Sequence, residues 1–389
     1  MPDTPSEPAV APREWSSPLP AGLAGCFESD RAKPARERRA MVAPSLVEDL
    51  FGIAAARSER PTASDATLVV DPSQQRGSGL QRALASPTGA TLGIGTMIDK
   101  YRIDGILGSG GFATVYRAKH MLLQIDVAVK LLKESLLVQN PQLVQMLCEE
   151  ARFAAQISHP NVVRVTDITS TERMTYIVME YIEGVTLSEA MEARPISSRE
   201  AVSIALDVCA GLAAGLAKGL IHRDIKPGNI MIAKDGRIRI LDFGLAKPME
   251  AVGDRSGPSG KTSAIVGTPA YMAPEQALRP DQADFRADIY SLGISLYHMT
   301  TGDLPFKAAD PMSLIKMHIE RPPPPPTAHN YPKALAKVVM RMIEKDPARR
   351  PQSYDELVAE LQQLLDDLSS TSSKSSMDIL GQFKNFFKK

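Results

Sequence analysis

Two polar segments place acids, bases and an amide where they could bind a metal ion and accept a proton. The first is His222-Arg-Asp224-Ile-Lys226-Pro-Gly-Asn229, and the second is Asp242-Phe-Gly244. Carboxylate and amide oxygens are ligands that Mg²⁺ prefers, so Asn229 and Asp242 could hold the metal. Asp224 is then left to accept a proton from a hydroxyl group. Either segment alone is as readily an ordinary polar loop, and the argument depends on finding both in this order.

A glycine-rich turn and a lysine upstream could bind phosphate. Gly108-Ser-Gly110-Gly111-Phe-Ala-Thr-Val115 lies between two expected strands, where glycines let backbone N–H groups approach phosphate oxygens. A dinucleotide-binding loop needs a helix directly after the glycines, and 115–119 continues as a strand instead. Lys130 ends the apolar strand Val127-Ala-Val-Lys130, and Glu150 lies on the next expected helix. An ion pair between Lys130 and Glu150 could hold the lysine over two phosphates. Taken singly, these are an ordinary hairpin turn, an edge lysine and a surface glutamate.

The elements that must position these residues change in type along the chain. Short segments rich in Val, Ile, Leu and Tyr predict strands at 101–108, 115–121, 124–132, 162–169 and 174–180, with a short apolar strand at 238–241. Longer segments predict helices at 141–157, 199–219, 285–301, 333–344 and 353–367. A β-rich part followed by a helical part is an α+β pattern with two lobes.

Composition excludes several classes of protein. The 389 residues carry 45 Lys+Arg and 45 Asp+Glu, which argues against a nucleic-acid binder that relies on bulk charge. The three cysteines, Cys26, Cys148 and Cys209, are far apart and form no CxxC pair, so a zinc site is not expected. The most apolar stretch, 201–221, is interrupted by charges and is interpreted as a buried helix, so no transmembrane segment is expected. We expect a soluble, cytoplasmic protein.

These motifs together resemble the protein-kinase superfamily, and most of all the eukaryotic-type serine/threonine kinases of bacteria. The resemblance covers roughly 97–367, and in combination its motifs are highly specific. They occur in the order that the family requires: the glycine turn, Val127–Lys130, Glu150, His159-Pro-Asn161, His222–Asp224, Asp242–Gly244, Gly267-Thr-Pro-Ala-Tyr-Met-Ala-Pro-Glu275, Asp288 and Arg350. The resemblance implies a bilobal α+β fold with an N-lobe at 97–181 and a C-lobe at 182–367.

The resemblance also implies a role for each site residue in a serine/threonine protein kinase that uses ATP and Mg²⁺ (or Mn²⁺). Asp224 would orient the acceptor hydroxyl and Lys226 would stabilise the γ-phosphate, while Asn229 and Asp242 would hold the metal. Lys130, held by Glu150, would orient the α- and β-phosphates. Met179 would be the gatekeeper beside the adenine. The remaining nucleotide-binding positions would be Leu107, Gly108, Ser109, Gly110, Gly111, Phe112, Ala113, Thr114, Val115, Ala128, Glu180, Ile182 and Met231. Glu275 and Arg350 would form a buried ion pair, and Asp288 would brace the catalytic loop.

Two departures and two alternatives matter. Ala113 replaces the third glycine of the turn, which stiffens it, and the insertion between Lys247 and Thr262 is rich in Gly, Ser and Pro. Lys226 and Thr268 are the serine/threonine signature, and protein substrates are expected. In a pseudokinase, Lys130, Asp224 or Asp242 would be replaced by another residue, and none of them is replaced here. A small-molecule phosphotransferase normally lacks the segment that ends at Glu275. A phosphate on Thr262 or Ser263 is expected to order the loop by autophosphorylation, near Arg223 and Lys247.

The flanks differ from the central region. Residues 1–96 are rich in Pro, Ser and Ala, and we expect disorder there. The island Ser45-Leu-Val-Glu-Asp-Leu-Phe-Gly-Ile-Ala-Ala-Ala-Arg57 could form a docking helix or only a transient one. Residues 368–376 predict a linker, followed by an amphipathic tail at 377–389 with Met377, Leu380, Phe383 and Phe387 on one face. The tail could dock on the kinase itself, on a partner or, least favoured, on a membrane; disorder is an equal alternative.

Overall fold

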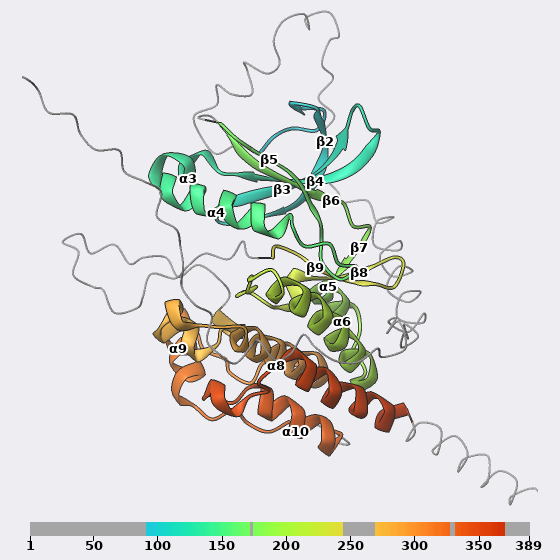
Figure 1. Ribbon diagram of the computed structural model, residues 1–389, viewed down its shortest axis with the longest axis vertical. Coiled ribbons are helices and arrows are strands. Elements are labelled where there is room, and N and C mark those ends of the chain that lie inside the picture. Colours follow the sequence, from blue (N-terminus) through green and yellow to red (C-terminus); the bar gives the residue numbers. More distant parts are fainter. Residues whose placement is uncertain (1–90, 172–173, 244–268, 327–330, 370–389) are drawn as a thin grey trace, which may run out of the picture. The chain divides into compact units, whose positions relative to one another are not determined.

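A computed structural model describes residues 91–171, 174–243, 269–326 and 331–369 of the chain. Residues 1–90 of the predicted N-terminal segment, the loop that holds Thr262 and Ser263, and the C-terminal tail lie outside these residues. Residues 91–96, which were predicted to be disordered, are ordered, and Leu92 N–H donates to the Tyr116 hydroxyl at 3.0 Å. Within them, a β-sheet with two helices precedes a larger helical part (Figure 1). The predicted α+β arrangement of two lobes is therefore confirmed.

The first part is built on a six-stranded antiparallel sheet with the order β1-β2-β3-β4-β6-β5. Apolar residues run along the central strands because both faces of the sheet are covered, one by a cluster around Val129 and Val178 and the other by a cluster around Ala128 and Ile177. Tyr101, Ile103 and Tyr116 are buried in the first of these clusters. The strand bounds are β1 Met97–Ile98, β2 Tyr101–Ser109, β3 Ala113–His120, β4 Ile125–Leu132, β5 Val165–Ser170 and β6 Thr175–Glu180.

Two helices follow β4 and lie against the sheet (Figure 1). Helix α3 (Glu134–Gln139) was not predicted. Helix α4 (Pro141–Ala154) begins with proline at its first turn, and the Asn140 side chain caps it by accepting from the Leu143 N–H at 3.0 Å. Leu143, Val144, Leu147 and Cys148 form its buried face. Helix α4 ends at Ala154, three residues before the predicted end at 157.

The second part is helical and has one large core. Helix α6 (Ser198–Leu216) starts at a capping box formed by Ser197 and Glu200, and it packs against α8 (Arg286–Thr301). Both helices are apolar almost all round, as helices inside a core must be. The other helices are α5 Leu187–Ala193, α7 Pro274–Leu278, α9 Pro311–Glu320, α10 Lys333–Met342 and a last helix over 354–369. No helix among the described residues is long and apolar enough to cross a membrane.

A second sheet belongs to the helical part, and the polar segments flank its strands. Its strands are β7 Gly184–Thr186, β8 Ile230–Ala233 and β9 Ile238–Ile240, in the order β7-β8-β9. The 3₁₀ turn η2 (Pro227–Asn229) leads into β8, and Asp242 follows β9 after one residue, Leu241. The hairpin of β8 and β9 thus brings 222–229 and 241–243 side by side, and Leu241 N–H bonds the Asn229 carbonyl at 2.9 Å.

Candidate active site

The segment 222–229 forms a compact hydrogen-bonded loop around one carboxylate. Lys226 Nζ lies 2.7 Å from Asp224 Oδ2, and Asn229 Nδ2 donates to the same oxygen at 2.8 Å. Asn229 Nδ2 also bonds the Asp224 carbonyl at 2.8 Å. Three predicted site residues therefore meet at one point, and the Asp224 Oδ1 atom is not used in these bonds.

A buried aspartate on α8 holds this loop from below. Asp288 is 1% exposed, and its two carboxylate oxygens accept the His222 N–H at 2.8 Å and the Arg223 N–H at 2.7 Å. Arg223 has a φ of 66°, a left-handed conformation that costs free energy for a residue with a side chain. The two bonds from Asp288 stabilise that conformation, which orients Asp224 next in the chain. The predicted brace is confirmed.

Asp242 faces the central strand β4. Its Oδ1 atom lies 2.8 Å from Lys130 Nζ, and its φ is 54°. Burial alone would raise the pKa of Asp242. The nearby charges of Lys130, His222 and Lys226 lower the pKa by more than burial raises it, so the net pKa lies below its ordinary value. Asp242 is therefore a carboxylate at neutral pH, as a metal ligand must be.

Phe243 anchors the Asp242 turn in the helical core. Its ring contacts the His222 ring edge-on, with centroids 5.2 Å apart, and His222 Nε2 bonds the Leu241 carbonyl oxygen at 2.8 Å. On the other side the ring sits against Gly215 of α6, where an added Cβ would lie 1.9 Å from a Phe243 ring carbon. Gly215 thus provides the space that Phe243 fills.

Glu150 differs from the prediction. The structure pairs Lys130 with Asp242 and not with Glu150, whose Oε2 atom is buried without a hydrogen-bond partner among the residues that the structure describes. Burial raises the pKa of Glu150 to about 7, and the charge of Arg223 opposes that shift. The predicted ion pair is therefore not formed in this conformation.

The glycine turn joins β2 to β3. Gly110 N–H bonds the Ala113 carbonyl at 2.9 Å and closes the turn. A Cβ at Gly108 or Gly111 would meet no atom within 4 Å, and none of these three glycines has a positive φ. The protein's own backbone therefore does not require glycine at these positions. Close approach of a ligand to the backbone would require it, which fits a phosphate group.

The residues expected around an adenine do not all lie in one cluster. Val115, Ala128, Met179 and Ile182 share the apolar cluster beside α4 and β5. Leu107 is outside it, on β2, and is 49% exposed. Met231 lies on β8 of the second sheet. Glu180 is the last residue of β6, and its backbone N–H donates to the Arg164 carbonyl at 3.0 Å.

The donor set fits a magnesium ion that shares its coordination with a substrate. Within the described ranges, no three His, Cys, Asp or Glu side chains cluster as a metal site built from protein alone would require. Asn229 and Asp242 provide an amide and a carboxylate on adjacent segments. Mg²⁺ commonly uses only one or two such protein ligands, together with phosphate oxygens and water.

Two residues that support the site escaped prediction. Gln276 Nε2 donates to the Arg223 carbonyl at 2.8 Å, and its Oε1 accepts from Ala273 N–H at 2.9 Å, so it ties α7 to the loop. Gly215 is the second missed residue, and no local sequence pattern indicates its role.

The predicted Glu275–Arg350 pair is confirmed: Arg350 is 0% exposed, with bonds of 2.6 and 2.8 Å to the two carboxylate oxygens of Glu275.

Comparison with known proteins places this geometry in context. Residues 101–363 match the family model described as the protein kinase domain. The probable serine/threonine-protein kinase CPE1738 of Clostridium perfringens is 36% identical over 288 residues, which cover 73% of this chain and 41% of that protein. Serine/threonine-protein kinase PknB of Mycobacterium tuberculosis is 37% identical over 270 residues, which cover 68% of this chain and 42% of that protein. The chain thus spans about two fifths of the length of these curated relatives.

A solved structure shares the fold. The crystal structure of the PknI kinase domain of Mycobacterium tuberculosis aligns with a TM-score of 0.55 and 24% sequence identity. The alignment covers 70% of this chain and 99% of that one. At this level of identity the likeness supports the two-lobed fold alone.

Proposed function

This chain belongs to the protein kinase family, and from that premise we propose that it transfers the γ-phosphoryl group of ATP to serine or threonine hydroxyls of protein substrates. One observation carries the proposal: Lys226 and Asn229 converge on the Oδ2 atom of Asp224 within 2.8 Å, beside the Lys130–Asp242 pair. An acid, an amide, a second acid and two cations thus converge where two polar loops meet. Phosphoryl transfer needs this combination, because its catalysis is mostly positioning and charge stabilisation.

Each of these side chains has a distinct part in the reaction. Asp224 uses the oxygen that Lys226 and Asn229 leave free to accept a hydrogen bond from the acceptor hydroxyl, and it takes the proton as the hydroxyl attacks. Lys226 then interacts with the γ-phosphoryl oxygens, on which negative charge develops. Asp288 keeps Asp224 in place through the loop backbone, so it is a positioning residue.

ATP and the metal would be held by residues on both lobes. The backbone of 108–115 would cover the phosphates, Lys130 would contact the α- and β-phosphates, and the apolar side chains of Val115 and Ala128 would cover the adenine. Asn229 and Asp242 would hold Mg²⁺, which when bound neutralises charge on the phosphate oxygens. Lys130 must leave Asp242 for this to happen, and Glu150 would then receive it.

The segment before α7 favours a protein acceptor over a small molecule. Residues 269–276, which include the Glu275 partner of Arg350, contact the catalytic loop through Gln276, whose Nε2 donates to the Arg223 carbonyl. Small-molecule phosphotransferases normally lack this segment. The test is to offer purified protein, with Mg²⁺ and ATP, a serine and threonine peptide library, a tyrosine library and an aminoglycoside. Phosphoserine or phosphothreonine is expected, and a product confined to the aminoglycoside would refute the acceptor class.

Three further points of the function rest on sequence. We place the reaction in the cytoplasm, supported by the free thiols of Cys148 and Cys209. Phosphorylation of Thr262 or Ser263 would activate the enzyme. The tail at 377–389 would dock on this chain or on a partner, and truncation after Asp367 tests it: an unchanged catalytic rate and an unchanged partner pull-down would exclude both.

A further inference from the structure

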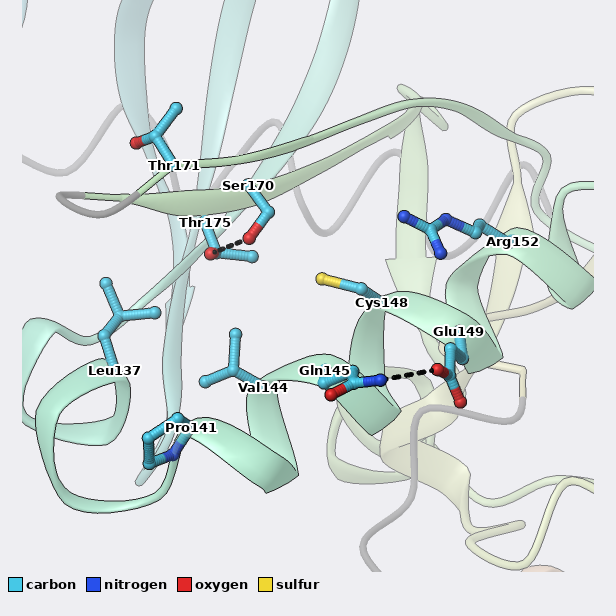
Figure 2. Close-up of a pocket in the computed structure, with 10 residues that line it drawn as sticks. All are labelled: Leu137, Pro141, Val144, Gln145, Cys148, Glu149, Arg152, Ser170, Thr171 and Thr175. Carbon is cyan, nitrogen blue, oxygen red and sulfur yellow. Dashed lines mark hydrogen bonds between the residues drawn. The ribbon is translucent and has the colours of Figure 1, made fainter. Parts of the chain in front are cut away.

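A second network of polar side chains lies in the helical part, outside the proposed catalytic loop. It joins Tyr290 of α8, His318 of α9 and Lys345, which follows α10. Tyr290 and His318 are buried and Lys345 is half-buried, so their polar atoms need hydrogen bonds to offset the loss of water. None of the three lines the pocket that Figure 2 shows between α3, α4 and the strands β5 and β6. The phosphoryl transfer described above gives none of them a role.

The lysine sets the direction of the hydrogen bonds. Lys345 Nζ lies 3.3 Å from the Tyr290 hydroxyl oxygen, and an ammonium can only donate. The hydroxyl therefore donates its own hydrogen to His318 Nδ1, at 2.9 Å. Burial lowers the pKa of His318 to about 4, the charge of Lys345 lowers it too, and the backbone of Ala270 opposes both. The ring is thus neutral, and its hydrogen is on Nε2.

The Nε2 atom of His318 is directed at the start of residues 269–276. It is buried and makes no hydrogen bond of standard geometry with a residue that the structure describes. The Ala270 backbone lies beside the ring and favours its protonated form, as a carbonyl facing an N–H does. Ala270 belongs to the 3₁₀ turn η3 (Pro269–Tyr271), which packs against α8 and α9. Lys345, Tyr290, His318 and Ala270 are called the donor chain below.

Lys345 also fixes the end of α9. Its Nζ atom donates to the His318 carbonyl at 2.6 Å and lies 3.4 Å from the Met317 carbonyl. Both carbonyls are near the end of the helix, where partners within the helix run out and the dipole favours a cation. The Phe306 ring covers the same ammonium, with its centroid 4.4 Å from Nζ. One lysine thus holds α9 and begins the donor chain.

Tyr290 contacts the other end of the same segment through its ring. The guanidinium carbon of Arg350 lies 4.8 Å from the ring centroid, and Arg350 pairs with Glu275. The hydroxyl of Tyr290 leads instead to His318 and Ala270. The two ends of 270–275 are therefore held by two separate arms that meet at one tyrosine, and a substitution can remove the hydroxyl arm alone.

We propose that the donor chain positions residues 269–276 to receive a protein acceptor. Lys345, Tyr290 and His318 are then positioning residues for the acceptor and not for ATP. The segment is joined to the catalytic loop through Gln276, so a polypeptide whose hydroxyl reaches that loop lies beside the segment. This inference rests on the proposed function, because it concerns the acceptor of that reaction.

The first test is steady-state kinetics in the full chain with Tyr290→Phe, which removes the hydroxyl and keeps the ring against Arg350. The acceptor is the best serine or threonine peptide from the library described above. We expect the KM for this peptide to rise about fivefold, as the loss of one hydrogen bond predicts, with kcat and the KM for ATP within about twofold of wild type. Lys345→Met should raise the peptide KM at least about tenfold, because it removes a charged donor. Tyr297→Phe, on the same helix but outside the donor chain, is the matched control and should keep all three constants.

A pair of substitutions at His318 tests which ring nitrogen matters. His318→Gln keeps an N–H donor near the position of Nε2, whereas His318→Asn moves it to the position of Nδ1. We expect the glutamine variant to keep the peptide KM within about twofold and the asparagine variant to raise it about fivefold. A role in packing alone would change the melting temperature of both variants and leave the peptide KM of folded protein unchanged.

A measurement without substrate separates this inference from the proposed function. Amide hydrogen exchange in residues 269–276, followed by mass spectrometry without ATP or peptide, should be about fivefold faster in Tyr290→Phe and unchanged in Tyr297→Phe. If wild type phosphorylates no peptide, the proposed function fails, and the exchange rates still decide whether the donor chain holds the segment.

Three results would overturn the proposal. A peptide KM that is unchanged in Tyr290→Phe, or a change confined to kcat or to the KM for ATP, would exclude a role in positioning the acceptor. The same peptide KM in the glutamine and asparagine variants of His318 would exclude the link through Nε2. Unchanged exchange in residues 269–276 of Tyr290→Phe would show that the donor chain does not hold this segment.

Discussion

Lys130 is the residue on which both lobes meet in this conformation. Its ammonium lies 2.8 Å from Asp242, and its side chain is 16% exposed, so little water competes for the charge. We predict that Lys130→Met lowers the rate of phosphoryl transfer by at least about 100-fold, which is about 3 kcal/mol, because it removes a cation from the phosphates. Lys119→Met, on the neighbouring strand β3 and in a half-buried ion pair with Asp126, is the control and should keep its rate. A wild-type rate in Lys130→Met would contradict the assignment.

Glu150 should make the stability of the domain depend on pH. Its pKa in the fold is about 7, against an ordinary value of 4.5, mainly because burial disfavours the charge. Below 4.5 the carboxyl is protonated in both the folded and the unfolded states, so it has no effect on stability. As the pH rises from 4.5 through 7, the unfolded state ionises first and the fold loses stability, and above 7 the cost is complete.

Replacing Glu150 by Gln removes that cost without changing the shape of the side chain. In the absence of nucleotide, we expect Glu150→Gln to melt at a higher temperature than wild type at pH 8 and at the same temperature at pH 4.5. Differential scanning calorimetry at both pH values measures this. An equal difference at both values would show that the buried charge of Glu150 is not the cause.

At the scale of elements, a glycine of α6 helps to position the turn that carries Asp242 and Phe243. Gly215 leaves room for Phe243, and a methyl group there would overlap the ring. We predict that Gly215→Ala displaces Phe243, moves Asp242 with it and lowers both stability, by about 1–3 kcal/mol, and catalytic rate. Gly293→Ala is the matched control, since its Cβ would crowd Met342 and Ile343 far from the site. Both variants should lose stability, and equal catalytic rates per folded molecule would argue against the coupling.

Long periodic segments were predicted well because their pattern is local. The helices at 199–219 and 285–301 were found within three residues of their observed ends, since a core helix is apolar over many turns. The short elements α3, α5, α7 and β7 were missed, because a few residues carry too little periodicity. The predicted strand at 162–169 begins at Val165, since Val162 makes only an isolated bridge to Ile240.

The polar residues of the site were named from their order along the chain, but their pairing was not. Sequence spacing places Lys130 and Glu150 on adjacent elements, whereas the partner of Lys130 is decided by how α4 sits against the sheet. The structure pairs Lys130 with Asp242 instead. Gln276 and Gly215 act through packing between distant segments, so no short motif reveals them.

For the molecule as a whole, the sequence predicts a switch in the loop before Thr268. The guanidinium of Arg223 forms no hydrogen bond or ion pair with the residues that the structure describes, and it lies near Glu150. A phosphate on Thr262 or Ser263 would give Arg223 a partner through charge-assisted bonds. We predict that mass spectrometry of the purified active protein finds phosphate there and that changing both to Ala lowers the rate at least about tenfold. Ser256→Ala with Ser259→Ala, in the same loop, is the control, and full activity in the Thr262 and Ser263 variant would exclude the switch.

The central claim is that Asp224 accepts the proton of a serine or threonine hydroxyl during transfer from ATP. The most direct measurement is the single-turnover formation of phosphoserine and phosphothreonine with radiolabelled ATP, in wild type, Asp224→Asn and Asp235→Asn. Asp235 is an exposed acid in the turn between β8 and β9 and serves as the control. We predict that Asp224→Asn is at least about 100-fold slower at an unchanged melting temperature, with Asp235→Asn at the wild-type rate. A wild-type rate in folded Asp224→Asn would contradict the claim.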